Sequence, residues 1–367
     1  MPGREVNTYK KEQNMINNIH IQNFRGIKDC TIDDLKRINL LLGYNNCGKS
    51  SVLDALFLYT SSTNPRFAMT INWVRRYMHN GPDNMILNFY QLNPDATIHL
   101  NGIYDNETKR RVVIEYHEEL SPTLQVPQNN VSAGNDKIYT LSMKTTIEHT
   151  DKSTETYETA IQASSSHPEN TVVKDAPKTY KETLHCIYQT ASDPYHDNSQ
   201  LYSVILKNKQ EKFVIDILKE IEPNLKDIVL ADGELLVDMG FDKRIPIQVL
   251  GDGIRKLLSL IISIYYCSNG ILLVDEIDNG IHYKSMPVMW LALLKAAKEY
   301  NVQLFATTHN IDSLQTLCKV VEEKKDSLWE ENIRVYTLRK TSDDTLKAIK
   351  STYKQFNHLI NQEIEIR

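Results

Sequence analysis

Residues 38–60 read INLLLGYNNCGKSSVLDALFLYT. The stretch begins with an apolar run (INLLL), continues through a polar segment bounded by glycines, and ends in apolar residues at helical spacing (VLDALFLYT). This order of strand, loop and helix delivers an anion to a helix N-terminus, where unpaired N–H groups and the helix dipole favour negative charge. The stretch therefore predicts an α/β fold built around an anion-binding loop.

The loop itself, residues 43–50, fits the pattern GxxxxGK[ST]. In this pattern backbone N–H groups cradle phosphates, the lysine neutralises the terminal phosphates, and the hydroxyl ligates Mg²⁺. The alternative is a turn that binds nothing, but the preceding strand and following helix favour the phosphate loop. We expect Ser50 to ligate the metal as well as the nucleotide. The predicted nucleotide-binding residues are Gly43, Tyr44, Asn45, Asn46, Cys47, Gly48, Lys49, Ser50 and Ser51.

The composition is that of a folded globular protein. Hydrophobic residues make up 41% of the 367 residues and charged residues 24%, which excludes wholesale disorder and collagen-like repetition. The net charge of −5 gives no overall positive field that would attract nucleic acid. It does not exclude a local basic groove. The five cysteines form no CxxC pair, so we expect free thiols and neither zinc nor disulfides.

No membrane segment is expected. The apolar segment LLSLIISIYYC (257–267) is about half the roughly 20 residues that a spanning helix needs. The N-terminus MPGREVNTYKKEQNMINN lacks the apolar core of a secretory signal, which predicts a cytoplasmic protein without a membrane partner.

The remaining segments predict one domain over 1–367 with two inserted parts. Alternating residues predict an antiparallel β subdomain at 97–165, and helical spacing predicts a helical lobe at 176–260. Towards its end, the predicted helical lobe contains three short strand patterns: DIVLAD, GELLVDM and IPIQVL. They are followed by the segment GDGIRKLLSLIISIYYC, whose pattern predicts a helix. We expect these strands, GILLVDEID and VQLFATTHN to restore a parallel α/β arrangement. The polar stretches 121–136 and 164–170 predict surface loops, with partner contact as the alternative.

Two acids end one of the apolar strands. In residues 271–276 (ILLVDE), the buried strand pattern stops at Asp275 and Glu276. This arrangement places Asp275 on Mg²⁺ and Glu276 beside an attacking water in phosphoryl transfer. The alternative is a pair of solvated acids at a strand end.

The order of these motifs resembles the ABC-type ATPase heads shared by the OLD (overcoming lysogenization defect) ATPases, the structural-maintenance-of-chromosomes proteins and the recombination-mediator ATPases. The opening IHIQNFRG (19–26) closely precedes the phosphate loop, and more than 150 residues separate that loop from Asp275. The resemblance covers nearly the whole chain. It implies an α/β P-loop ABC-type ATPase head with an antiparallel β subdomain and a helical lobe, hydrolysis of ATP, and ATP with Mg²⁺ as cofactors.

The segment LGDGIR (250–255) lies about two dozen residues before Asp275, where this group carries its signature loop. By resemblance, Gly251, Asp252 and Gly253 contact the γ-phosphate held by an opposite subunit. The common transporter signature has a serine in place of Gly251 and a glycine in place of Asp252. An Asp beside phosphate must point away or be neutralised, and a simple helix N-cap by Asp252 is the structural alternative.

Four further residues are candidates by resemblance. His309, at the end of ATTHN, would sense the γ-phosphate as a catalytic residue, and His282 would lie in the loop that crosses the dimer interface. Arg25 would contact phosphate, and Gln91 would be linked to Mg²⁺. The alternatives are packed histidines, a surface cation and a polar loop residue.

The signature loop reaches a nucleotide only from another subunit, so the resemblance implies a homodimer or higher homo-oligomer closed head to tail around ATP. The chain ends soon after its last predicted strand, without a fused nuclease, so we expect a separate effector protein. By analogy, the protein is the ATPase component of a bacterial anti-phage or abortive-infection system that controls a nuclease or toxin. The alternatives are a DNA-binding repair ATPase, which leaves nucleic acid open as a partner, and the nucleotide-binding subunit of a transporter.

Overall fold

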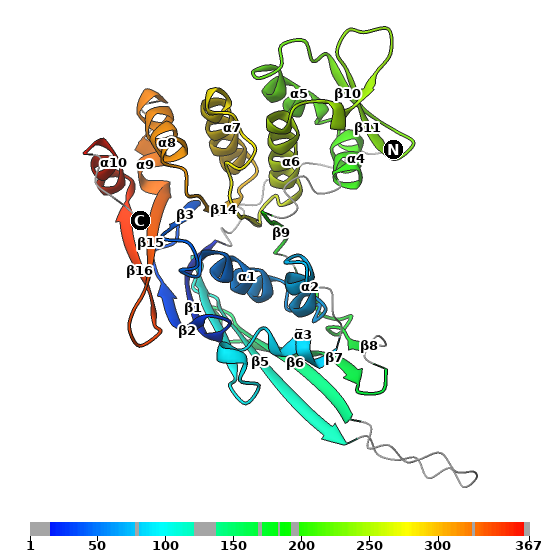
Figure 1. Cartoon of the computed structure of the whole chain (residues 1–367), viewed down its shortest axis with the longest axis vertical. Helices are drawn as coiled ribbons and strands as arrows, with labels where there is room; N and C mark the ends of the chain where they lie inside the picture. The colour runs from blue at the N-terminus through cyan, green and yellow to red at the C-terminus, as the bar shows by residue number, and fades with distance from the viewer. Residues whose placement is uncertain are drawn as a thin grey trace.

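The structure is a computed structural model that describes residues 15–77, 81–120, 137–167, 171–182, 184–191, 198–324 and 327–362. The loop predicted at 121–136 and residues 168–170 of the loop predicted at 164–170 lie outside the described residues. Figure 1 shows helices α6, α7 and α8 over one side of a mostly parallel sheet, with α1 between this sheet and a long antiparallel sheet.

The parallel sheet has six strands in the order β16-β15-β3-β14-β13-β9. The strands pair in parallel from β15 to β9, and β16 joins β15 antiparallel at the edge. Every residue of β3, β13 and β14 is buried, because helices or a second sheet cover both faces. The strands are β3 (Ile38–Leu42), β9 (Cys186–Gln189), β13 (Ile271–Val274), β14 (Gln303–Thr307), β15 (Ile333–Lys340) and β16 (Leu346–Thr352).

Alternate residues of each parallel strand point into two different hydrophobic cores. Leu40 packs in the core with the helices α6–α8, whereas Leu41 packs in the core with α1 and the antiparallel sheet. Leu272 and Leu273 divide in the same way. The helices of these two cores are α1 (Lys49–Thr60), α6 (Asp252–Tyr266), α7 (Met286–Glu299) and α8 (Ile311–Lys324).

The antiparallel sheet has seven strands in the order β2-β1-β4-β5-β6-β7-β8. The four strands predicted between 97 and 165 are present as β4 to β7. They continue the N-terminal strands because β4 pairs with β1. The strands are β1 (Ile16–Phe24), β2 (Ile27–Ile32), β4 (Ile98–Tyr104), β5 (Lys109–Leu120), β6 (Lys137–Glu148), β7 (Thr154–Ser164) and β8 (Thr171–Lys174).

The strands within residues 176–260 pair differently from the prediction. Three of them, β10 (Asp227–Ala231), β11 (Glu234–Asp238) and β12 (Ile245–Pro246), form a separate antiparallel sheet, so our assignment of them to the parallel arrangement was wrong. Asp232 and Gly233, both with positive φ, join β10 to β11. A two-residue turn of this kind enforces antiparallel pairing, whereas parallel pairing needs a long crossover. The parallel strand β9 was not predicted, since four residues show no usable periodicity.

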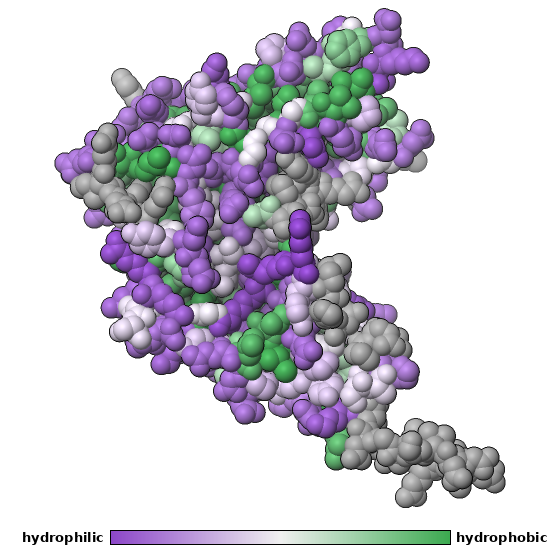
Figure 2. Space-filling model, viewed as in Figure 1, coloured by the Kyte–Doolittle hydropathy of each residue, from purple (hydrophilic) through white to green (hydrophobic). Residues whose placement is uncertain are grey.

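Shorter helices complete the described part of the chain. They are α2 (Phe67–Trp73), α3 (Pro82–Ile86), α4 (Ser199–Lys207), α5 (Glu211–Lys219), α9 (Ser327–Asn332), α10 (Tyr353–Asn361), η1 (Tyr90–Leu92), η2 (Ile247–Val249) and η3 (Tyr283–Ser285). Figure 2 shows a mostly hydrophilic face, indented between the part that carries α4 to α6 and the antiparallel sheet.

All five cysteines are free thiols, as the sequence predicts. Burial raises the pKa of Cys30, Cys186 and Cys318 to about 12, so these thiols stay protonated near neutral pH. Within the described ranges, no helix is long and apolar enough to cross a membrane.

Gly270 permits the close approach of the chain before β9 to the start of β13. A Cβ atom there would lie 2.1 Å from the carbonyl oxygen of His185 and 2.9 Å from that of Cys267. We expect Gly270→Ala to lower the free energy of unfolding by about 1–3 kcal/mol, because backbone atoms must move apart. Urea unfolding measures the change. Gly26→Ala is the control, since a Cβ there meets nothing within 4 Å; equal stability of the two variants would contradict the close approach.

Candidate functional site

The predicted motifs meet at one edge of the parallel sheet. Residues 43–50 connect the end of β3 to the start of α1. The register places Leu41 opposite Thr307 and Ala306 opposite Val274, so β3, β14 and β13 end side by side. The carboxyl edge of a parallel sheet is where such folds place their ligands.

Two glycines give the phosphate loop its conformation. At Gly43, with φ +138°, a Cβ atom would lie 2.6 Å from the carbonyl oxygen of Leu338 and 2.7 Å from Cys47 Sγ. Gly48, with φ +107°, is the N-cap of α1. Because a glycine cap has no side chain, it cannot cover the amides of the first turn, which are the groups that bind an anion.

Lys49 is held inside this loop. Its side chain is buried, and Nζ donates to the carbonyl oxygens of Gly43 and Tyr44, both at 2.8 Å. Burial lowers the pKa of Lys49, and Cys47, Asp275 and Glu276 act in the opposite direction. The ammonium therefore lies within the electrostatic reach of both acids.

One hydroxyl positions both acids at the end of β13. Thr307 Oγ1 donates to Asp275 Oδ1 at 2.6 Å and accepts from the backbone N–H of Glu276 at 2.8 Å. Glu276 has φ +52°, so the chain turns sharply away from the strand direction at this acid. Thr307 was not among the predicted site residues. Its position at a strand end two residues before His309 was the available signal.

Gln189 connects the acids to α6. Its carbonyl oxygen accepts from the backbone N–H of Asp275 at 2.8 Å. Its side-chain Nε2 donates to Ser259 O at 3.0 Å, Ser259 Oγ at 2.9 Å and Ser263 Oγ at 2.8 Å. The strand end and the helix after the predicted signature loop are therefore joined through one buried residue, for which the sequence carried no signal.

The predicted signature residues lie at the start of α6. The helix begins at Asp252 with Gly251 as its N-cap, so the alternative of an Asp252 N-cap is wrong. The exposed carboxylate of Asp252 accepts from Arg255 NH1 at 3.2 Å, which neutralises this acid. A Cβ atom at Gly251 would meet nothing within 4 Å, so this backbone is accessible.

Arg25 lies inside the fold, on a buried carboxylate. Its NH1 donates to Asp54 Oδ2 at 2.5 Å, and its NH2 donates to Asn72 Oδ1 at 2.6 Å. Asp54 also accepts from Arg75 NH2 at 2.6 Å and from the hydroxyl of Tyr188 at 3.0 Å. The structure thus gives Arg25 protein partners, and its phosphate contact stays a prediction. Asp54 and Arg75 carried no sequence signal.

The other candidates lie in separate loops. Gln91, exposed and with φ +52°, donates from Nε2 to the hydroxyl of Tyr90 at 3.0 Å. His282 is exposed at the N-cap of η3, and its Nδ1 accepts from the N–H of Lys284 at 3.3 Å. His309 is half-buried just after β14, at the same sheet edge as Asp275. The roles of all three stay predictions.

The donor set fits Mg²⁺ that is bound together with a nucleotide. Ser50 and Asp275 offer oxygen ligands at the edge where β3 and β13 end. In the part of the chain that the structure describes, no group of three or more His, Cys, Asp or Glu could hold a metal. Mg²⁺ commonly binds through one or two carboxylates, substrate phosphates and water, so a hydroxyl and a carboxylate suffice.

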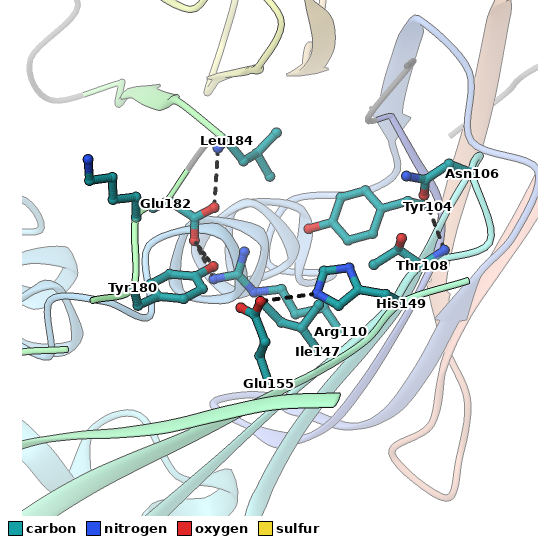
Figure 3. A pocket seen from close by; sticks show the side chains of 11 residues that line it. Tyr104, Asn106, Thr108, Arg110, Ile147, His149, Glu155, Tyr180, Glu182 and Leu184 are labelled. Carbon is teal, nitrogen blue, oxygen red and sulfur yellow. Dashed lines mark hydrogen bonds and ion pairs between the residues drawn. The ribbon is translucent and has the colours of Figure 1, made fainter. Parts of the chain in front are cut away.

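A cavity of about 300 Å³ lies away from the phosphate loop, over the antiparallel sheet. Figure 3 shows the buried guanidinium of Arg110 with Glu182 and Tyr180 facing it. Arg110 NH2 donates to Glu182 Oε2 at 2.7 Å, Ser62 Oγ at 2.9 Å and Tyr157 OH at 3.2 Å. Because the charge of Arg110 is compensated within the fold, we assign this cavity no part in nucleotide chemistry.

Asp54 stabilises the helix α1 against the segments that carry Arg25 and Arg75. We expect Asp54→Ala to reduce the free energy of unfolding by about 3–5 kcal/mol, because the buried Arg25 guanidinium loses its carboxylate. Chemical denaturation measures the loss. Asp175→Ala is the matched control, since Asp175 is exposed and pairs with Arg66 only at 3.6 Å, so a change within about 0.5 kcal/mol is expected. A similar loss in both variants would contradict the role of Asp54.

Two protein-family models match the chain. Residues 15–184 match "AAA ATPase domain", and residues 144–314 match "AAA domain, putative AbiEii toxin, Type IV TA system". An ATP/GTP phosphatase of Helicobacter pylori is 22% identical over 342 residues, which cover 84% of this chain and 89% of that protein. The DNA replication and repair protein RecF of Francisella tularensis subsp. novicida is 27% identical over 124 residues, 33% of this chain and 34% of RecF.

Among solved structures, the chain is similar to an Smc head domain with an extended coiled coil, bound to the C-terminal domain of ScpA, from Pyrococcus furiosus. The TM-score is 0.47 and the sequence identity is 10%. The match covers 95% of this chain and 99% of that one. The SMC head domain from Thermotoga maritima gives 0.42 and 10%, covering 92% and 98%. The two family models both describe AAA ATPase domains and together extend from residue 15 to residue 314. These matches support ATP hydrolysis, and the chain is an ATPase with an α/β fold built around a phosphate loop.

Proposed function

We propose that this ATPase is a conformational switch of the OLD type, in which two or more copies close head to tail around ATP and open after hydrolysis. The observation that carries the proposal is the connection through Gln189. This residue joins the acids at the end of β13 to the helix that begins at residues 251–253, of which Gly251 and Asp252 are exposed. ATP chemistry at one end of this connection is thereby linked to a surface that a second copy can reach.

In the proposed reaction, water is the acceptor of the γ-phosphoryl group. Lys49 and the amides at the start of α1 hold the phosphates. Ser50 and Asp275 would hold Mg²⁺, which neutralises phosphate charge when it is bound. Glu276 accepts a proton from the attacking water while the new O–P bond forms and the bond to the ADP oxygen breaks. His309, at the same edge, is the proposed sensor of the γ-phosphate.

The surface of the α6 N-terminus supports the head-to-tail arrangement. Gly251 is open, and the amides of the first turn of α6 suit an anion. Asp252 would repel a phosphate, but its ion pair with Arg255 reduces this charge. We propose that residues 251–253 contact the γ-phosphate bound to another copy, in a homodimer or higher homo-oligomer, with His282 in the interface.

The finer proposal is that the switch controls a separate nuclease or toxin in a bacterial anti-phage or abortive-infection system. Its support is the family description matched by residues 144–314, which names the AbiEii toxin and a type IV toxin–antitoxin system. A cytoplasmic location, where ATP is supplied to such a switch, is part of this proposal.

A DNA-binding repair ATPase is the second candidate. The relative RecF, a DNA replication and repair protein, supports it over one third of the chain. The net charge of −5 counts against a dominant phosphate-backbone interaction, which needs concentrated Lys and Arg. Salt-sensitive binding of duplex DNA would distinguish the two candidates.

Replacement of the proposed base tests the assignment of the site. We expect Glu276→Gln to bind ATP but to release phosphate about 10²–10⁴-fold more slowly, because it keeps the shape of the side chain and removes the proton acceptor. Lys49→Ala should lose ATP binding itself. Phosphate release and equilibrium dialysis with ATP measure the two effects, and Glu299→Gln, on the far end of α7, is the control. Wild-type turnover in both site variants would show that the site is assigned wrongly.

The switch is tested by the solution mass of Glu276→Gln with and without Mg·ATP. We expect ATP to double the mass, and we expect the doubled form to capture the product of the neighbouring gene without retaining a short duplex DNA. Retention of DNA only with ATP would favour the repair ATPase. A mass that does not respond to nucleotide would overturn the head-to-tail mechanism.

The hydroxyl of Thr307 offers a prediction for both acids. Thr307→Val keeps the shape of the buried side chain but removes the hydrogen bonds to Asp275 and Glu276. We expect kcat to fall by about 10²-fold, the cost of a misplaced catalytic group. Thr307→Ser, which retains the hydroxyl, should stay close to the wild type. Equal activity of the two variants would exclude a positioning role for the hydroxyl.

A further inference from the structure

Lys256 is a buried lysine that the proposed reaction does not use. It lies on α6 with a side chain that is 0% exposed. Among the described residues, its Nζ has no hydrogen-bond partner. Lysine is almost never fully buried without a partner, since transfer of an ammonium out of water is unfavourable. The position therefore calls for an explanation.

The charged groups that act on Lys256 all belong to the segment that follows β13. Asp278, Asp275 and Glu276 favour the charged ammonium, in this order of influence. Burial opposes them and lowers the pKa of Lys256 to about 8. The ammonium thus lies within the electrostatic reach of the three carboxylates that include the proposed metal ligand and the proposed base.

Helix α6 lies close to the segment after β13 at one point, and it contacts Gln189 at the end of β9 at two others. A Cβ atom on Gly253 would lie 3.7 Å from the carbonyl oxygen of Gly280. Ser259 and Ser263 receive hydrogen bonds from Gln189, whose backbone binds Asp275. Residues 256, 259 and 263 have the spacing of one helix face, so Lys256 belongs to the face of α6 that contacts Gln189 at the end of β9.

A second unpartnered atom lies on this face. The side-chain Oε1 of Gln189 is buried and has no hydrogen-bond partner among the described residues. A buried donor, Lys256 Nζ, and a buried acceptor, Gln189 Oε1, thus lie at the junction of α6 and β13 without partners. A junction whose polar groups are incompletely paired has hydrogen bonds still to gain when the helix and the strand end shift relative to each other.

We propose that Lys256 is a positioning residue for ATP hydrolysis, whose buried ammonium acts electrostatically on the carboxylates of residues 275–278 and couples displacement of α6 to Glu276. The inference rests on the proposed function, because the displacement would come from the γ-phosphate of another copy bound at residues 251–253. Lys256 itself does not touch the nucleotide. It acts through Asp275 and Glu276, the proposed metal ligand and the proposed base.

A lysine that served only the fold would affect stability on substitution and would leave the turnover of ATP unchanged. Replacement of a buried charge by an apolar side chain of similar volume is often neutral or stabilising, because the desolvation of the charge is avoided. A variant that is as stable as the wild type but hydrolyses ATP slowly would therefore show that Lys256 acts on the reaction and not on the fold.

The test compares Lys256→Met and Lys256→Arg in the full chain, with Lys295→Met as the control. Lys295 is an exposed lysine on the neighbouring helix α7. We expect Lys256→Met to keep or raise Tm, to leave the KM for ATP unchanged, and to lower kcat by about 10²-fold. Lys256→Arg should recover part of kcat, and Lys295→Met should match the wild type.

Other outcomes would overturn the inference. Wild-type kcat in Lys256→Met would show that the ammonium is dispensable, and a fall in Tm that accompanies loss of ATP binding would show a structural role. If Lys256→Met does not fold, Lys256→Gln keeps a polar side chain of similar length, and its full kcat would overturn the inference. The proposed function fails separately, because it requires that Glu276→Gln lose turnover whatever Lys256 does.

Discussion

The parallel pairing of β3, β14 and β13 is the constraint on which the site depends. Because these three strands run side by side in one direction, the phosphate loop, the acids and His309 all follow strand ends at one edge. A slip of two residues in β14 would keep the hydrophobic faces intact, yet it would separate Thr307 from Asp275. The buried side chains of the strands therefore fix the catalytic geometry as well as the core.

Two buried lysines act on the acids at this edge. Lys49 in the phosphate loop and Lys256 on α6 both lie within the electrostatic reach of Asp275 and Glu276. Burial of both lysines makes their interactions with the acids stronger than in water. The acids are thus influenced by two lysines, one in the predicted phosphate loop and one on the helix that follows the proposed signature loop.

Sequence alone was sufficient wherever the functional residues are contiguous. The phosphate loop and the pair Asp275–Glu276 are short motifs next to strongly apolar strands, so residue order implies their positions. Gln189, Thr307 and Lys256 act through contacts across the fold, and no local pattern marks them. The strands β10 to β12 were recognised but placed in the wrong sheet, because the turn at Asp232–Gly233 decides their pairing more strongly than their apolar content.

The two connections between α6 and the acids differ in how they depend on distance. The hydrogen bonds of Gln189 are directional, and they weaken steeply when the donor and acceptor separate or tilt. The attraction between Lys256 and the carboxylates falls only with the inverse of the distance. A displacement of α6 therefore weakens the Gln189 hydrogen bonds before it greatly changes the electrostatic effect of Lys256 on Glu276. In the proposed switch, the hydrogen bonds of Gln189 respond first to movement of the helix, and Lys256 keeps acting on the acids over a longer range.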